Sequence, residues 1–116
     1  MHQSTIHIEV KTDENRIPAA ISWKASDTGA AENQPARAMF LSFWDPADKS
    51  ALRIDLWTKE MMVDEMADFF YQNIMGMGDT YMRATQDKEL SDEFKKFAKT
   101  FLTKFKESQL KQNNTK

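Results

Sequence analysis

The sequence contains no cysteine, and this absence excludes several kinds of chemistry. Disulfides, thiolate nucleophiles and zinc or iron–sulfur centres built on cysteine cannot form. No run of apolar residues approaches the roughly 20 that a helix needs to span a bilayer. The first ten residues also lack the basic and apolar regions of a signal peptide. We therefore expect a cytoplasmic protein with no membrane insertion.

The two signs of charge nearly balance, because 18 acidic residues outnumber 16 basic ones by two for a net charge of −2. This near-balance argues against a generally basic nucleic-acid binder. The most basic stretch, residues 91–116, has seven lysines but no arginine, the residue that forks onto bases and phosphates. We interpret it as a solvated helix face and expect no nucleic-acid partner. The 116 residues, 41% of them apolar, fit a single domain over residues 1–116 with its own core.

Alternating apolar and polar residues predict four β-strands within residues 4–58. The strands are expected at residues 4–11, 17–24, 36–44 and 51–58, and they form two antiparallel hairpins. Pro18 should lie at a strand start or on an edge, because proline cannot donate to a ladder. Residues 36–44 could also form a short helix after Pro35, but we favour the strand. Between the hairpins, the small and polar residues 26–35 predict a mobile surface loop.

The second part of the chain, residues 64–112, has the periodicity of two amphipathic helices. We expect the first to be capped by Asp64 and the second by Ser91, with a frayed tail over residues 113–116. Gly76 and Gly78 weaken the first helix and could mark a kink or a close helix contact. The predicted fold is therefore α+β, a four-stranded antiparallel sheet followed by two helices packed on one face, in the order ββββαα. Its core should bury Phe97 and Phe101 against Ile8, Ile21 and Ile54.

Residues suited to catalysis or metal binding are scarce. His7 and Glu9 share a strand face and could bind a metal together with His2, but a solvated strand face is the simpler interpretation. None of the three glycines belongs to a phosphate-binding loop of the GxxxxGK[ST] or GxGxxG type. We predict no catalytic, cofactor-binding or metal-ligating residue, and hence no enzyme and no cofactor. A pocket lined by His7, Arg53 and Asp55 would instead indicate a small-ligand-binding domain or an enzyme.

Large aromatic residues provide the strongest functional signal. If the strand registers hold, aromatic and charged side chains lie on the sheet face opposite the isoleucines and leucines. Exposed apolar patches usually mark an interface. Six of the eight methionines lie between Met61 and Met82, where they could fill the core or form an adaptable surface. We expect a protein partner or a homo-oligomer at a candidate interface made of Phe40, Trp44, Arg53, Asp55 and Trp57.

Four sequence segments together point to a family. The most specific is ALRIDLWTKEMMVDEMADFFYQNI at residues 51–74, and it is accompanied by IPAAISWKASD, ARAMFLSFWDP and DTYMRAT. These segments resemble the gliding motility protein GldC family of Bacteroidota. The resemblance implies a small, soluble, non-enzymatic accessory protein of gliding motility, whose partners could belong to the gliding machinery or to the secretion system tied to it. The order of four strands and two helices is also similar to that of SecB-type export chaperones, so a chaperone that binds unfolded polypeptides stays an alternative.

Overall fold

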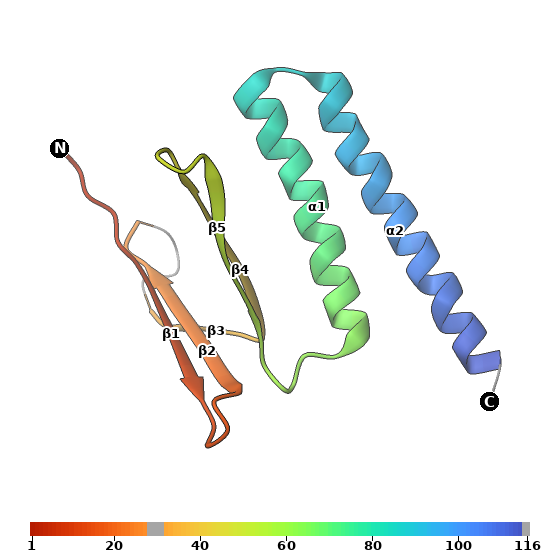
Figure 1. The fold of residues 1–116 in the computed structure, drawn as a ribbon, viewed down its shortest axis with the longest axis horizontal. Coiled ribbons are helices and arrows are strands. Elements are labelled where there is room, and N and C mark those ends of the chain that lie inside the picture. Colours follow the sequence, from red (N-terminus) through yellow and green to blue (C-terminus); the bar gives the residue numbers. More distant parts are fainter. Residues whose placement is uncertain (28–31, 115–116) are drawn as a thin grey trace. The chain divides into compact units, whose positions relative to one another are not determined.

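The computed structural model describes residues 1–27 and 32–114 of the chain. Five strands precede two helices, which confirms the α+β class (Figure 1). The chain divides into two compact units, a strand unit over Met1–Met61 and a helix unit over Met62–Lys116. Among the described residues, neither helix has an apolar stretch of the length needed to cross a membrane.

The first sheet contains β1 (Ile6–Thr12), β2 (Pro18–Ala25) and the short β3 (Gln34–Ala36), in the antiparallel order β1-β2-β3. The predicted β1–β2 hairpin is confirmed, and Pro18 is the first residue of β2. Its turn is closed by the Asp13 side chain, which accepts backbone hydrogen bonds from Asn15 and Ile17.

Strand β3 corrects the predicted loop over residues 26–35. Gln34 and Pro35 pair with Trp23 and Ser22 of β2, so the loop ends before them. A strand of three residues, one of them a proline, is too short to show the alternation of apolar and polar residues that predicts a strand. Residues 28–31 of the predicted loop lie outside the described part of the chain.

The second sheet is the hairpin of β4 (Ala38–Asp45) and β5 (Ser50–Trp57), which pair without a register shift. This pairing confirms a strand, and not a helix, over most of residues 36–44. The strands thus form two sheets of three and two strands, where a single four-stranded sheet was predicted. The division falls at Arg37, where pairing with β2 ends and the Arg37 carbonyl accepts a hydrogen bond from the Thr58 N–H at 2.8 Å.

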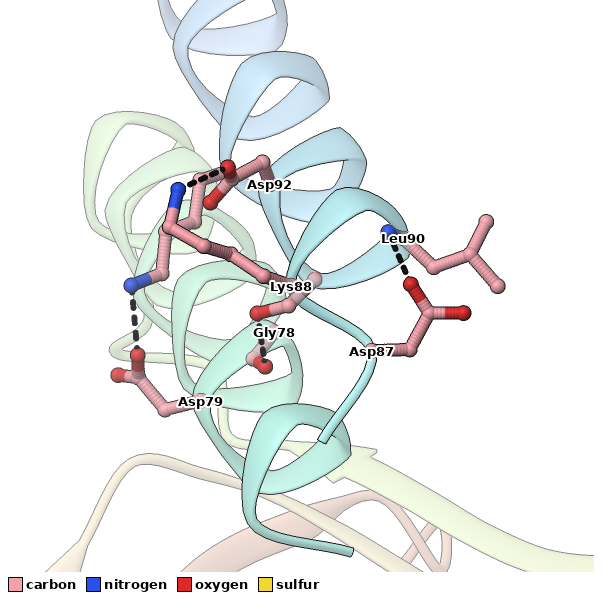
Figure 2. Close-up of polar contacts among 8 residues, drawn as sticks. Gly78, Asp79, Asp87, Lys88, Leu90 and Asp92 are labelled. Atoms are coloured by element: carbon pink, nitrogen blue, oxygen red, sulfur yellow. Dashed lines mark hydrogen bonds and ion pairs between the residues drawn. The ribbon is translucent and has the colours of Figure 1, made fainter. Parts of the chain in front are cut away.

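The helix unit consists of α1 (Val63–Thr85) and α2 (Lys88–Asn114). Both predicted caps are wrong by a few residues. The N-cap of α1 is Met62, two residues before the predicted Asp64. Its N–H donates a hydrogen bond to the Glu65 side chain. Asp87, not Ser91, caps α2 by accepting the Leu90 N–H at 3.1 Å (Figure 2). Residues 113 and 114, predicted to fray, are still helical, and residues 115–116 lie outside the described chain.

The two helices approach each other through small residues. The buried positions of the helix unit are Ala67 and Gly78 on α1 and Ser91 and Ala98 on α2, and Gly78 and Ser91 meet in the seam between the helices. The Ser91 hydroxyl donates a hydrogen bond of 2.6 Å to the Gly78 carbonyl across the seam (Figure 2). A Cβ at Gly78 would lie 3.1 Å from both Phe94 Cβ and the Ser91 carbonyl oxygen, so Gly78 marks the predicted close helix contact.

Few large apolar side chains are buried. Among the described residues, the buried apolar ones are Ile21, Ala25, Ala67 and Ala98. Phe97 is 57% exposed and Ile54 49% exposed, so the predicted burial of these two is wrong. Phe101 is half-buried and stacks on Phe70 of α1 at a centroid distance of 6.3 Å. The packing of the helices on a sheet stays a prediction.

Candidate protein-binding surface

The register of the second sheet brings the five candidate interface residues together on one face. Alternate residues of a strand point to the same side, and directly paired residues share that side. The relevant pairs are Ala38 with Trp57, Phe40 with Asp55, Ser42 with Arg53, and Trp44 with Ala51. Phe40, Trp44, Arg53, Asp55 and Trp57 therefore lie on the same face of the β4–β5 hairpin, which we call the aromatic face.

An ion pair lies at the centre of the aromatic face. Arg53 donates to both carboxylate oxygens of Asp55, from Nε at 3.1 Å and from Nη2 at 3.0 Å. The guanidinium carbon also lies 5.8 Å from the centroid of the Phe40 ring, within range of a cation–π interaction. Both side chains stay partly exposed, so this is an ion pair at the surface of the sheet. The pair lies between the positions of the two tryptophans on this face.

The tryptophans of the aromatic face are open to solvent, with Trp44 66% exposed and Trp57 58% exposed. Phe40 is half-buried. Tryptophan and arginine dominate the energetics of protein interfaces, where they bury large areas and still form polar contacts. The arrangement therefore suits binding of another polypeptide.

The opposite face of the same hairpin is apolar except at its end, where Asp45 pairs with Ser50. It joins Met39 with Leu56, Leu41 with Ile54, and Phe43 with Leu52. Phe43 and Leu52 are both more than half exposed. A two-stranded hairpin is marginally stable in water on its own, so a hairpin that exposes large apolar side chains on both faces needs something to cover it.

The two histidines lie beside different carboxylates. His7 contacts Glu9 at 3.0 Å, as their shared strand face predicts, but His2 lies 3.0 Å from Asp27 instead. The hydrogen bond and charge of His7 lower the pKa of Glu9 below its usual range. In the part of the chain that the structure describes, no three His, Asp or Glu side chains gather as metal ligands would.

Cavities within the described residues include two that lie outside the predicted site. One, of about 610 Å³, follows α1 of the helix unit and is lined by residues that include Phe69, Gly76, Met77 and Phe94. The other, of about 470 Å³, lies in the strand unit beside Arg37 and Thr58. Neither cavity is lined by the residues named for a ligand pocket, His7, Arg53 and Asp55. Sequence reasoning missed both cavities, and only the glycine inside a helical pattern hinted at the first.

Thr58 is a buried polar residue that lines the second cavity. Its side chain is 3% exposed, and its hydroxyl has no hydrogen-bond partner among the described residues. Arg37, on the same cavity, pairs with Glu60 at 3.9 Å. These groups make the cavity polar on one side.

Comparison with known proteins places the chain in a family. The model of the family described as gliding motility-associated protein GldC-like matches residues 18–107. Neither curated proteins nor solved structures give a match. The matched range includes every strand of the aromatic face and most of both helices. Because it covers well over half of the sequence, the chain belongs to the GldC-like family of gliding motility-associated proteins.

Proposed function

We propose that this protein is a non-enzymatic, cytoplasmic accessory protein of gliding motility that acts by binding another protein through its aromatic face. Membership in the GldC-like family supports the role in motility. The observation that supports protein binding is the exposure of Trp44 and Trp57 on either side of the Arg53–Asp55 pair. This role needs no cofactor. The partner belongs to the gliding machinery or to the secretion system associated with it.

The exposed tryptophans can supply a useful affinity. Their combined exposed area is on the order of 300 Å², so its burial is worth about 7 kcal/mol before the costs of association. A micromolar complex has a net binding free energy of about 8 kcal/mol, so neighbouring contacts must offset the association costs and supply the remainder. The Arg53–Asp55 pair carries no net charge, so the complementary partner segment should itself be apolar with paired or neutral polar groups.

Capture of partners from gliding cells tests the proposal, with the purified chain as bait. The double variant Trp44→Ser with Trp57→Ser removes both tryptophans from the aromatic face. Phe43→Ser with Leu52→Ser is the matched control, because these residues are similarly exposed on the opposite face of the same hairpin. We expect the tryptophan variant to lose a partner that both the control and the wild type retain. A folded tryptophan variant that keeps the same partners would contradict the proposal.

A SecB-like chaperone stays the second candidate, because both faces of the β4–β5 hairpin expose large apolar side chains. Such a surface also suits unselective binding of unfolded chains. Light scattering during the refolding of an unrelated client separates the two roles. A chaperone should suppress aggregation of the client at a near-equal concentration, whereas a dedicated motility adaptor should leave it unchanged.

A further inference from the structure

The outer edge of β5 is open and regular. Within the described chain β5 pairs with β4 alone, and this pairing continues over eight residues without a bulge or a proline. Native proteins rarely leave so long an edge uncovered, because its free N–H and C=O groups template further pairing. The edge of β5 therefore needs an occupant.

The hydrogen bond between Thr58 and Arg37 shows which residues face that edge. Hydrogen-bonded and non-hydrogen-bonded pairs alternate along an antiparallel ladder. Thr58 bonds to the neighbouring strand, so Ile54, four residues earlier, directs its backbone groups to β4 as well. Arg53 and Asp55, on either side of Ile54, consequently direct their N–H and C=O groups outward.

The sequence of this edge is self-complementary about Ile54. In LRIDL, residues 52–56, leucines flank an arginine and an aspartate placed symmetrically around the central isoleucine. We propose that the protein forms a two-fold symmetric homodimer by antiparallel pairing of β5 with β5 of a second copy, with Ile54 on the axis. This pairing sets Arg53 opposite Asp55 of the second copy, Leu52 opposite Leu56, and Ala51 opposite Trp57. The outward backbone groups of Arg53 and Asp55 then bond directly to each other.

Charge selects this register over its neighbours. Centring the axis on Arg53 places two arginines opposite each other, and centring it on Asp55 places two carboxylates together. Like charges directly opposite on a sheet are destabilising, whereas opposite charges and apolar pairs stabilise. Moving one strand by an odd number of residues would place residues whose backbone groups point toward the second copy opposite residues whose backbone groups point toward β4. The strand thus specifies a second copy of itself as the occupant, in the isologous manner of a two-fold interface.

This inference goes beyond the proposed function, and the two can fail separately. The axis is perpendicular to the sheet, so both aromatic faces lie on the same side of a four-stranded sheet. Ile54 lies on the opposite face from Trp44 and Trp57. Ile54→Lys should therefore give a monomer that still captures the partner, whereas Trp44→Ser with Trp57→Ser should lose the partner.

Single cysteines test the register directly, because the chain has no other cysteine. At a non-hydrogen-bonded pair on the axis, the two Cα atoms are about 4.5 Å apart, which a disulfide can bridge. Ile54→Cys should therefore cross-link into a dimer under mild oxidation. Leu52→Cys is the matched control on the same strand and face, where the two Cα atoms are about 14 Å apart. Equal cross-linking of the two variants, or none with Ile54→Cys, would overturn the proposal.

A charge exchange provides a second, independent measurement. Arg53→Asp and Asp55→Arg each place like charges together, so each variant should self-associate at least tenfold more weakly by analytical ultracentrifugation. Mixing the two variants restores Arg–Asp contacts across the axis and should restore the dimer. Each variant also loses the Arg53–Asp55 ion pair within its own strand, and mixing cannot restore that pair. If the ion pair only stabilised its own strand, the mixture would therefore stay as weakly associated as each variant alone. A monomeric wild type at high micromolar concentration, or a mixture that stays monomeric, would overturn the dimer.

Discussion

Gly76 and Gly78 lie two residues apart in α1, yet alanine should have opposite effects on stability at the two positions. In a helix interior, alanine is more favourable than glycine by about 0.8–1 kcal/mol. A Cβ at Gly76 would have no neighbouring atom within 4 Å. Gly76→Ala should therefore raise the free energy of unfolding by about 1 kcal/mol.

At Gly78 the same gain is opposed by crowding in the helix seam. The new Cβ would lie 3.1 Å from Phe94 Cβ and 3.1 Å from the Ser91 carbonyl oxygen. A backbone oxygen cannot rotate away, so the helices must separate, and overpacking of this kind costs about 1–3 kcal/mol. Gly78→Ala should therefore be neutral or destabilising by up to about 2 kcal/mol.

Urea denaturation followed by far-ultraviolet circular dichroism measures both variants against the wild type. The informative quantity is the difference between the two, because the gain from helix propensity cancels and the crowding term is left. We expect Gly78→Ala to be less stable than Gly76→Ala by about 1–3 kcal/mol. If Gly78→Ala stabilises as much as Gly76→Ala, the helices separate freely at this point and the tight seam is refuted.

Three further predictions concern single polar groups. Ser91→Ala removes the hydrogen bond across the seam and should cost about 0.5–1.5 kcal/mol in the same assay, whereas Thr100→Ala, whose hydroxyl bonds only within its own helix, should cost nothing. Thr58→Val removes a buried hydroxyl with no described partner and should be neutral or stabilising by about 1 kcal/mol; a clear loss would show that the hydroxyl is bonded. The hydrogen bond and charge of Lys95 lower the pKa of Asp79, so this contribution is present above the ordinary carboxyl pKa and is lost as pH falls through the lowered value. Unfolding at pH 3 and pH 6 should therefore show a smaller loss at low pH for Asp79→Asn than for the wild type.

The strands and their faces could be predicted because the evidence for them is local. A period of two residues assigns Arg53 and Trp57 to one face of their own strand, whereas Trp44 joins that face only through the register of the hairpin. The division of the sheet at Arg37 was not predictable in this way. It depends on which strands pair beyond that residue, and no spacing within the segment records it.

The caps show where sequence signals compete. Asp87 and Ser91 both precede acidic residues and an apolar stripe, so either could start α2. In the structure Asp87 caps α2, and the Ser91 hydroxyl instead bonds to Gly78 on the other helix. A contact between residues 13 positions apart is invisible to a capping rule. Gly78 indicated a close contact between helices, but the sequence does not show which residue lies against it.

The tryptophans make the predicted dimer observable without labels. All three, Trp23, Trp44 and Trp57, lie in strands, so fluorescence reports the strand unit while circular dichroism is dominated by the helices. In the strand unit, the buried apolar residues among those described are Ile21 and Ala25. The stability of this unit should therefore depend on what covers it.

If a second copy covers β5, mass action links stability to protein concentration, and a tenfold increase adds about 0.7 kcal/mol per chain. The fluorescence midpoint in urea should then rise with concentration for the wild type and stay constant for Ile54→Lys. The helix signal adds a second result. If the helices pack on a sheet, as the amphipathic stripes predict, both signals should move together as one cooperative transition. If they do not, the helix signal should stay where it is while the fluorescence midpoint rises. A fluorescence midpoint that does not change with concentration in the wild type would refute the dimer, whatever the helices do.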